Sequence, residues 1–411
     1  MKPYINFVLL LLASSTITAQ THNFGEFVVA ENTVFSNEEA FTNDSNASFI
    51  NDGETYFYGD LLNNGIVDYT SGSIGGTHFV GNALQVISGL AVSYFNNIVF
   101  NNTDQELANI SVNSTVQIAN SADFIDGIVN VDADSGQFIF ESNAIATNAN
   151  NASFVDGIVN KQGNNDFNFP VGDSSYHREV LISGLADPDA AFTAKYHFED
   201  PTITYPKERK RGVIEVVNDS EYWVVENTSG NEEVLITLSW QENATPEAIL
   251  KGPKTGIHVI RWNPVEELWE HEGGVVDEAN RQVTTLSTVE NYGIFTLGRV
   301  KENSILPTGT AVYNAISVNN DGKNDFFNII DIEDYPNNTV EIFNRWGAKL
   351  YSTNNYASNG NVFRGFREIG DGIGNRALPT GTYYYVILYD YTLDGTTRRA
   401  KKAGFLYINS D

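Results

Sequence analysis

"ADFIDGIVN" occupies residues 122–130 and "ASFVDGIVN" occupies residues 152–160, so nearly the same nine residues recur thirty positions apart. The opening of this motif appears a third time as "ASFINDG" at residues 47–53. All three copies place apolar residues before an Asp-Gly pair, which is typical of short strands that end in tight turns. Self-similarity at a fixed spacing predicts stacked β units in this part of the chain.

Residues 20–205 continue this pattern, with short apolar runs separated by Asn, Asp, Gly and Ser. For residues 20–115 we expect a β-repeat region. Its Asn-rich composition favours a β-solenoid, in which side-chain amides form ladders along the stack. An antiparallel sandwich with similar strands is the alternative. For the β-rich residues 116–205 we expect a sandwich.

The composition of the whole chain agrees with an all-β fold class. Its 411 residues suffice for about two or three domains. The chain has 34 Gly, 25 Phe and 20 Tyr, and beyond the N-terminal segment no stretch shows sustained helical periodicity. It has no Cys, so packing, hydrogen bonds or bound ions must stabilise it in place of disulfides.

Residues 1–19 are predicted to form a secretory signal peptide. Lys2 precedes an apolar run at residues 5–13, and small residues lead to a cleavage point between Ala19 and Gln20. The apolar run is shorter than the roughly 20 residues that a membrane-spanning helix needs. We therefore expect no transmembrane segment in the mature chain.

Residues 206–302 are predicted to form a β-sandwich-like domain, followed by a linker at residues 303–309. The domain begins with the basic segment "PKERKRG" at 206–212, a solvated boundary for which protease processing or a polyanion contact is the alternative. Its aromatic residues at strand spacing are expected in the core, with sugar-stacking platforms as the alternative. They include Trp223, Trp240, Trp262 and Trp269.

The charge of the chain is strongly negative and unevenly distributed. The net charge is −28, and no Lys or Arg occurs between Pro3 and Asn160. Binding to phosphates requires clustered cations, so nucleic acid and anionic membranes are excluded as partners of this region. The acidic surface provides solubility and is compatible with calcium or neutral glycans.

The C-terminal quarter contains five motifs in a fixed order. They are "NNDGKND" at 319–325, "YPNN" at 335–338, "IFNRWG" at 342–347, "LPTGTYYYVI" at 378–387 and "GFLYI" at 404–408. This part of the chain resembles the gliding-motility-associated C-terminal domain of the Bacteroidetes, the type B sorting domain of type IX secretion cargo. It departs from the family pattern at Asn320, where the family usually has Gly, and at Phe363, where the family has Trp.

The resemblance implies an Ig-like β-sandwich at residues 310–411 that directs export through the outer-membrane translocon. It implies that translocon and shuttle components are partners, and that the protein is located at the cell surface or outside the cell. The motif residues that carry it are Asp321, Gly322, Asn324, Asp325, Tyr335, Pro336, Asn337, Asn338, Phe343, Asn344, Arg345, Trp346, Gly347, Gly381, Thr382, Tyr383, Tyr385 and Gly404.

Four cations near the C-terminus lie on or beside a predicted strand: Arg398, Arg399, Lys401 and Lys402. Charged residues of this kind commonly protect a sheet edge from unwanted pairing. A contact with the export machinery is the alternative.

Residue spacing predicts no complete metal-binding or catalytic site. The loop "VNNDGKNDFF" at 318–327 cannot supply calcium ligands in any EF-hand register, because Lys323 or Gly322 falls on a ligand position in each of them. Asp and Asn next to Gly322 instead indicate a turn. Asp132 and Asp134 are weak calcium candidates, since they alternate but lack further acids. No Cys nucleophile, HExxH or GxSxG pattern occurs, so we expect no catalytic residues and no cofactor.

These features predict a non-enzymatic, secreted or cell-surface structural or adhesin-like protein. Residues 20–300 would form the extracellular body and residues 310–411 the export signal. One alternative is a secreted glycan-binding protein that uses exposed Trp or Tyr side chains. The other is a polysaccharide-acting enzyme.

Overall fold

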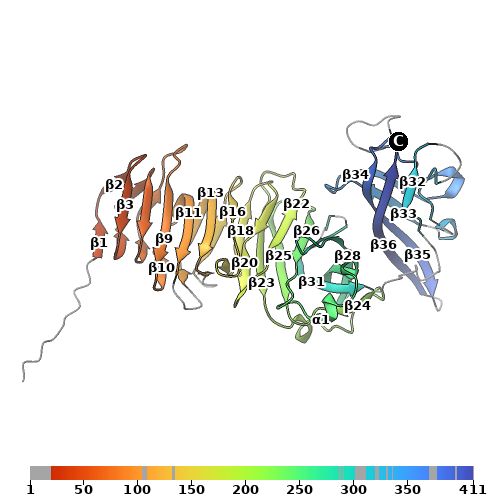
Figure 1. Ribbon diagram of the computed structural model, residues 1–411, viewed down its shortest axis with the longest axis horizontal. Helices are drawn as coiled ribbons and strands as arrows, with labels where there is room; N and C mark the ends of the chain where they lie inside the picture. The colour runs from red at the N-terminus through yellow and green to blue at the C-terminus, as the bar shows by residue number, and fades with distance from the viewer. Residues whose placement is uncertain are drawn as a thin grey trace, which may run out of the picture.

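The chain is described here by a computed structural model. It covers residues 20–410 except 104–108, 132–134, 287, 290, 301–311, 320–323, 330–331, 336, 370–376 and 394–395. The expected signal peptide and linker therefore lie outside the described residues. So do the candidate residues Asp132, Asp134, Asp321, Gly322 and Pro336. Figure 1 shows a row of strands that runs from the N-terminal part through the middle of the chain to a C-terminal sheet, which confirms the all-β fold class.

The N-terminal part is a β-solenoid of about six turns, which confirms the favoured prediction for this region. Three sheets of parallel strands form its faces. The first contains β1 (Gln20–Asn23), β4 (Ala40–Asn43), β7 (Leu61–Asn63), β10 (Gln85–Ser88), β12 (Ile110–Val112), β14 (Val129–Val131), β17 (Val155–Asp156) and β20 (Val171–Asp173). The second contains β2 (Glu26–Val29), β5 (Ser48–Asn51), β8 (Ile66–Asp68), β11 (Ser93–Asn102), β13 (Thr115–Asp126), β15 (Gln137–Phe140) and β18 (Val159–Gln162). The third contains β3 (Val34–Asn37), β6 (Glu54–Phe57), β9 (Gly76–Gly81), the distal halves of β11 and β13, and β16 (Ile145–Thr147).

The parallel stacking does not stop at residue 115, where we expected a change to a sandwich. β12 pairs in parallel with β14, β14 with β17, and β17 with β20. The reason is that each further turn still supplies inward-facing apolar residues, such as Phe124, Phe138 and Val155, to the same core. The expectation of a sandwich from residue 116 is therefore wrong for the first part of that region.

Side-chain amides form a ladder inside the solenoid, as the Asn-rich composition predicts. Asn23 donates from Nδ2 to Oδ1 of Asn43 at 2.9 Å, and Asn43 donates to Oδ1 of Asn63 at 3.0 Å. Asn63 continues the ladder to Oγ of Ser93 at 3.1 Å. Asn43 and Asn63 are completely buried, so these bonds satisfy amides that would otherwise be costly to bury.

The middle of the chain changes to antiparallel pairing where β18 meets β23 (Ala191–His197). One sheet then continues through β25 (Tyr222–Ser229), β31 (Gly293–Val300), β24 (Ile214–Val217), β27 (Ile257–Asn263) and β28 (Leu268–Gly273). A second sheet contains β19 (Phe167–Phe169), β22 (Val180–Ser183), β26 (Leu235–Ser239), β30 (Gln282–Thr284) and β29 (Val275–Asp277). Strands from both sides of residues 206–212 thus share each sheet. The short elements β21 (Tyr176–His177), η1 (Pro201–Ile203), α1 (Glu247–Leu250) and η2 (Lys254–Gly256) complete this part.

A single apolar core joins the solenoid to the middle sandwich. It extends from Val29 in β2 to Leu297 in β31, and a smaller separate cluster at β24, β27 and β28 contains Trp262 and Trp269. All four Trp residues of the sandwich are buried. The core interpretation of these aromatic residues is therefore correct, and the sugar-stacking alternative for them is wrong.

The C-terminal domain contains one five-stranded sheet. In spatial order its strands are β32 (Ala315–Ser317), β36 (Thr396–Asn409), β35 (Gly381–Leu393), β33 (Thr339–Phe343) and β34 (Lys349–Asn354). Instead of a second extended sheet, the described residues cover one face of this sheet with loop segments, η3 (Ile332–Asp334) and η4 (Ser358–Gly360). Isolated bridges join Val312 to Ile329 and Phe366 to Ala377. Within the described part of the chain, we find no helix long and apolar enough to span a bilayer.

Candidate functional site: the C-terminal domain surface

The C-terminal motifs fall into residues that build the fold and residues that face solvent. Tyr385 in β35 is buried in the domain core and pairs with Gly404 in β36. A Cβ atom on Gly404 would lie 2.5 Å from the Tyr385 hydroxyl oxygen, so only glycine leaves room for this ring. Tyr383 is also buried, and its hydroxyl donates to the carbonyl oxygen of Pro379 at 2.9 Å. These residues form the scaffold of the domain. Gly381 and Thr382 lie at the start of β35, where Thr382 is exposed.

The "YPNN" motif fixes the segment that leads into β33. Asn338 is buried and donates from Nδ2 to the carbonyl oxygens of Ile332 and Tyr335, each at 3.0 Å. Its Oδ1 accepts the backbone N–H of Tyr356 at 2.6 Å. The Tyr335 ring packs edge-on against Tyr389 at 5.1 Å, and Asn337 has a positive φ of 65°. The motif therefore closes a loop by hydrogen bonding.

Only part of the "NNDGKND" loop is described. Asn324 has a φ of 53°, and its carbonyl oxygen accepts the backbone N–H of Ser317 at 2.8 Å. Asp325 follows it, and Phe327 is buried in the domain core. A left-handed Asn with a local backbone bond is typical of a turn. The interpretation of the whole loop as a turn stays a prediction, because its centre lies outside the described residues.

The "FNRWG" motif forms a tight turn between β33 and β34 whose tip faces solvent. Asn344 Oδ1 accepts the backbone N–H groups of Trp346 at 3.0 Å and Ala348 at 2.9 Å. Gly347 takes a φ of 76° and donates its N–H to the carbonyl oxygen of Asn344. The guanidinium of Arg345 stacks over the Trp346 ring at 4.2 Å. Phe343, the first residue of the motif, is buried.

Phe343 belongs to the sheet face that contacts the middle sandwich. It forms a small apolar cluster with Val386 of β35 and Leu286 of the sandwich. Nearby, Nζ of Lys401 lies 3.6 Å from a carboxylate oxygen of Glu272. A Cβ on Gly347 would approach the Leu235 side chain at 2.7 Å. The C-terminal domain is therefore docked on the sandwich in this structure.

The four C-terminal cations do not form one patch. They alternate along β36, so Arg399 and Lys401 point to one face of the sheet and Arg398 and Lys402 to the other. Arg399 pairs with Asp390 at 3.2 Å, and Lys401 pairs with Glu272. Burial lowers the pKa of Lys402, while Arg398 is exposed. At this end of β36, pairing among the described strands is with β35 alone. Protection of a sheet edge by these cations stays a prediction.

Arginine side chains of the basic segment at 206–212 form ion pairs with acidic residues of the same chain. Arg209 pairs with Glu267, and Arg211 contacts Glu266 at 2.6 Å and Glu270 at 2.9 Å. The series continues from Glu270 through Arg261 to Glu272, which also faces Lys401 of the C-terminal domain. The two adjacent acids Glu266 and Glu267, at the turn of the β27–β28 hairpin, thus each pair with an arginine of this segment.

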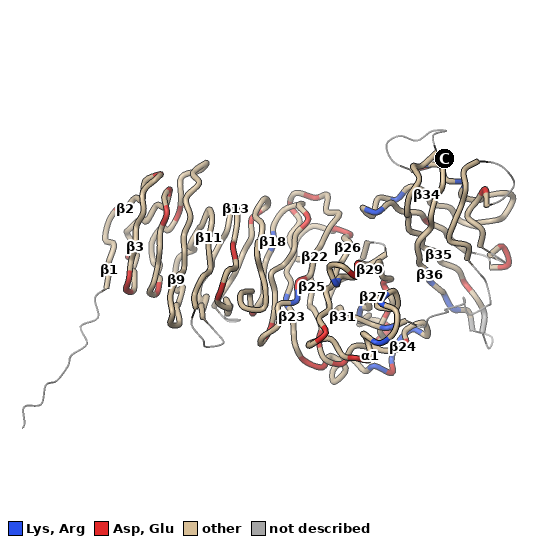
Figure 2. Tube along the Cα trace, in the orientation of Figure 1, with Lys and Arg blue, Asp and Glu red and all other residues tan. Residues whose placement is uncertain are grey.

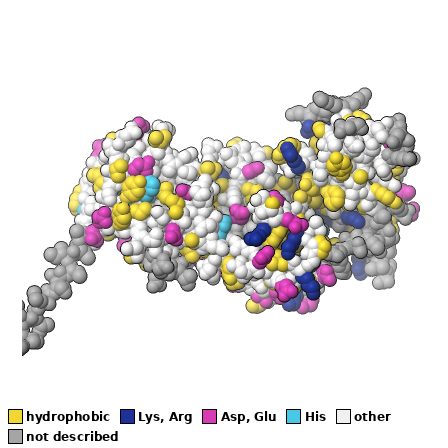
Figure 3. Space-filling view, in the orientation of Figure 1, with side chains coloured by type: hydrophobic (Ala, Val, Ile, Leu, Met, Phe, Trp, Pro, Cys, Tyr) yellow, Lys and Arg dark blue, Asp and Glu magenta, His cyan; other side chains and the backbone are white. Residues whose placement is uncertain are grey.

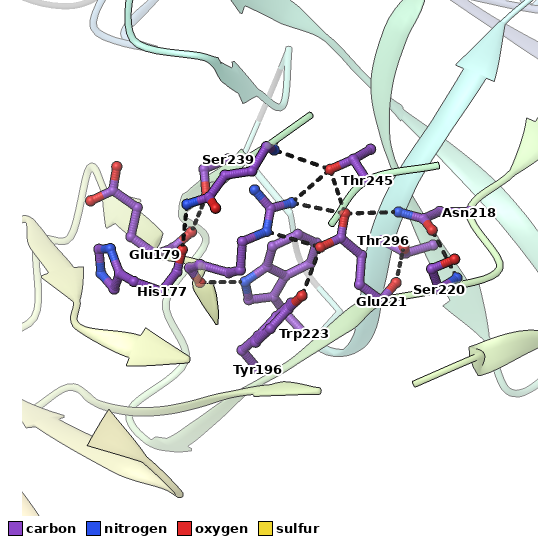
Figure 4. Close-up of polar contacts among 12 residues, drawn as sticks. His177, Glu179, Tyr196, Asn218, Ser220, Glu221, Trp223, Ser239, Thr245 and Thr296 are labelled. Atoms are coloured by element: carbon purple, nitrogen blue, oxygen red, sulfur yellow. Dashed lines mark hydrogen bonds and ion pairs between the residues drawn. The ribbon is translucent and has the colours of Figure 1, made fainter. Parts of the chain in front are cut away.

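Sequence reasoning missed a buried polar cluster at the junction of solenoid and sandwich. Arg178 and Glu221, both fully buried, form a two-pronged ion pair with distances of 2.9 and 2.8 Å. Figure 4 shows Tyr196, Asn218 and Thr245 directed at the Glu221 carboxylate, to which they donate at 2.8, 3.1 and 2.7 Å. Burial beside this carboxylate strongly raises the pKa of the Tyr196 hydroxyl.

This cluster serves the fold, since its members lie on separate segments and are shielded from solvent. The indole N–H of Trp223 adds a bond to the carbonyl oxygen of Arg178 at 2.8 Å. No fixed spacing in the sequence marks these residues, because they meet only in the folded chain. The described residues also contain no group of three or more His, Asp or Glu arranged to hold a metal ion.

Residues 310–408 match the family model described as the CHU_C Type IX secretion signal domain. The C-terminal domain is therefore a type IX secretion signal domain, as the five ordered motifs indicated. Such a domain directs the chain across the outer membrane to the cell surface or the extracellular space. Neither the curated proteins nor the solved structures compared with the chain gave a match.

Proposed function

We propose that residues 20–300 form a non-enzymatic structural or adhesive body that the C-terminal domain delivers to the outside of the cell. The observation that carries this proposal is the single core shared by the solenoid and the sandwich. A continuous core and parallel ladders make the body a stiff rod rather than a chain of hinged modules, because such stacking leaves little room for local motion. A stiff extended body suits a role in display or surface contact.

The outward faces of the solenoid support the same proposal. Figure 2 shows acidic positions along the solenoid and cations only from its last turns onward. On the third face, Asp123 of β13 accepts hydrogen bonds from the hydroxyl of Thr147 and the amide of Asn148 on the next turn. Polar side chains on neighbouring turns are thus held in place by one another, and an array of such side chains could bind a repetitive extracellular partner.

The glycan-binding alternative has lost its main support, because the four sandwich Trp side chains are buried. Among the described residues, the exposed aromatic side chains that could serve it include Tyr58 and Tyr94 on the solenoid and Trp346 in the C-terminal domain. A glycan array with the purified protein tests this alternative directly. Release of new sugar ends from polysaccharide would support an enzyme instead.

Deletion of residues 306–411 tests delivery by the C-terminal domain. In a cell with a functional type IX system, we expect the full chain at the surface or in the medium and the truncated chain in the periplasm. Cell fractionation with quantitative immunoblotting measures this distribution. Export of the truncated chain at the level of the full chain would contradict the assignment.

A deletion of residues 20–300 that keeps the leader and residues 306–411 tests the adhesive role of the body. Adhesion of whole cells to abiotic and polysaccharide surfaces should fall in cells that display only the C-terminal domain. Unchanged adhesion would contradict an adhesive role and leave a purely structural one.

A further inference from the structure

Trp346 is exposed in a protein that otherwise buries its Trp side chains. Its exposed fraction is 67%, whereas Trp223, Trp240, Trp262 and Trp269 range from 0 to 9%. Trp346 belongs to none of the four apolar clusters formed by the described residues. A large aromatic side chain that does not pack into a core is available for binding.

The backbone beneath Trp346 is held in one conformation. The Asn344 carboxamide accepts two N–H groups of the turn, and Gly347 supplies the positive φ that closes it. Leu235 of the sandwich packs close to Gly347 on the side facing the body. A partner therefore meets a turn whose backbone is already fixed, which lowers the entropic cost of binding.

Arg345 defines the chemistry of the tip. Its guanidinium covers one face of the indole at 4.2 Å and is itself exposed. The pair presents an apolar ring and a positive charge side by side. Trp and Arg are the residue types most enriched among binding hot spots.

We propose that Arg345 and Trp346 are the contact by which a protein subunit of the type IX export machinery binds the folded C-terminal domain. The complementary surface on the partner is an apolar slot that holds the indole. Carboxylates beside this slot pair with Arg345. The proposal assigns a recognition role to two residues of a domain whose other described motif residues mainly build its fold.

The charge of the chain argues against an anionic lipid surface as the occupant. With a net charge of −28, the chain as a whole is repelled by such a surface. Figure 3 shows that the visible face of the solenoid half carries acidic and apolar side chains, while Lys and Arg gather toward the sandwich and the C-terminal domain. An acidic slot on a protein subunit is the complement of the tip.

The test compares full-length variants by fractionation in a cell with a functional type IX system. Loss of a binding hot spot weakens binding by about 30-fold. We therefore expect the Trp346→Ala variant to accumulate in the periplasm. The amount of this variant outside the cell should be at least about 10-fold lower than that of the wild-type chain. Arg345→Glu should show the same defect, and Trp346→Phe should retain part of the export. The matched control is Phe405→Ala, which removes another exposed aromatic side chain of the same sheet.

Export of Trp346→Ala and Arg345→Glu at the wild-type level would overturn the proposal. An equal export defect in Phe405→Ala would also overturn the proposal, because export would then depend on exposed apolar surface in general. The thermal midpoint of each purified variant excludes misfolding as the cause. If Trp346→Ala is destabilised, Arg345→Glu alone decides, since it keeps the indole.

Fluorescence provides a second measurement, because Trp346 is the one well-exposed residue among five Trp. Its quenching by acrylamide should be unaffected by vesicles of phosphatidylcholine or of phosphatidylglycerol. Protection by either vesicle would identify a lipid surface as the occupant and overturn the assignment to a protein subunit.

Discussion

At the scale of single residues, the C-terminal motifs contain two kinds of residue: those that pack inside the domain and those that are exposed to solvent. Asn338 and Tyr385 are buried and satisfy local hydrogen bonds or fill the core. Arg345 and Trp346, by contrast, face solvent from a rigid turn. Both groups belong to the same set of sequence motifs. Only their positions in the folded domain distinguish the residues of the scaffold from those of the contact surface.

Gly404→Ala is expected to destabilise the C-terminal domain by about 1–3 kcal/mol, the usual cost of overpacking a core. The added Cβ would lie 2.5 Å from the Tyr385 hydroxyl and 2.7 Å from its ring carbon Cζ. Urea unfolding of the purified full chain measures the change. The control is Gly381→Ala in the neighbouring strand, where no heavy atom lies within 4 Å of the new methyl group. Equal stability of both variants would contradict this explanation.

At the scale of secondary-structure elements, the near-repeat predicted stacking but not its register. The two nine-residue copies are thirty positions apart, yet Val129 pairs with Val155, twenty-six positions on. The Asp-Gly pairs lie at three different corners of the solenoid, since Gly53 leads from β5 to β6, Gly127 from β13 to β14, and Gly157 from β17 to β18. The repeated motif therefore encodes a strand followed by a corner, and the length of each turn sets the register.

Asn43→Ala is expected to destabilise the solenoid by about 2–3 kcal/mol, because it leaves buried groups without partners. Asn43 lies between Asn23 and Asn63 in the amide ladder and also donates to the carbonyl oxygen of Ile66 at 2.9 Å. Chemical unfolding followed by circular dichroism measures the loss. The exposed Asn165→Ala should stay within about 0.5 kcal/mol of wild type. A cost no larger for Asn43 than for Asn165 would mean that the ladder adds nothing to stability.

At the scale of the whole molecule, the C-terminal domain meets the sandwich beside two stacked histidines. His258 and His271 lie with Nδ1 and Nε2 2.5 Å apart, and Glu272 and Lys401 lie next to them. Burial lowers the pKa of His258 to about 4. Burial, with the nearby charges of His258 and Lys401, holds the pKa of His271 well below its usual range. Both rings are therefore neutral in the docked structure at neutral pH.

Acidification is expected to weaken this structure through these histidines. In the unfolded chain they bind protons near pH 6.5, so the unfolded state binds more protons between that pH and the folded pKa. For His258 alone, stability should fall by about 2 kcal/mol from pH 7 to pH 5. The loss should level off below the folded pKa. Thermal midpoints measured across this range report the change.

The His258→Gln/His271→Gln variant should show a flatter pH dependence than wild type over the same range. His22→Gln is the control, because His22 lies on the exposed first strand. If the double variant and the control keep the wild-type slope, the stacked histidine pair is not responsible.

The sequence by itself determined the all-β class, the stacked repeats, the amide ladder and the type IX export signal that contains the five C-terminal motifs. These features depend on strand propensity, turn residues and ordered local motifs, all of which are written in contiguous stretches. Only the tertiary structure decided how far the solenoid extends, that strands on both sides of residue 206 share two sheets, and that Arg178 meets Glu221. It also separated the buried Trp side chains of the sandwich from the exposed Trp346. The physical reason is that burial and long-range pairing depend on which distant segments pack together, and no local spacing encodes that choice.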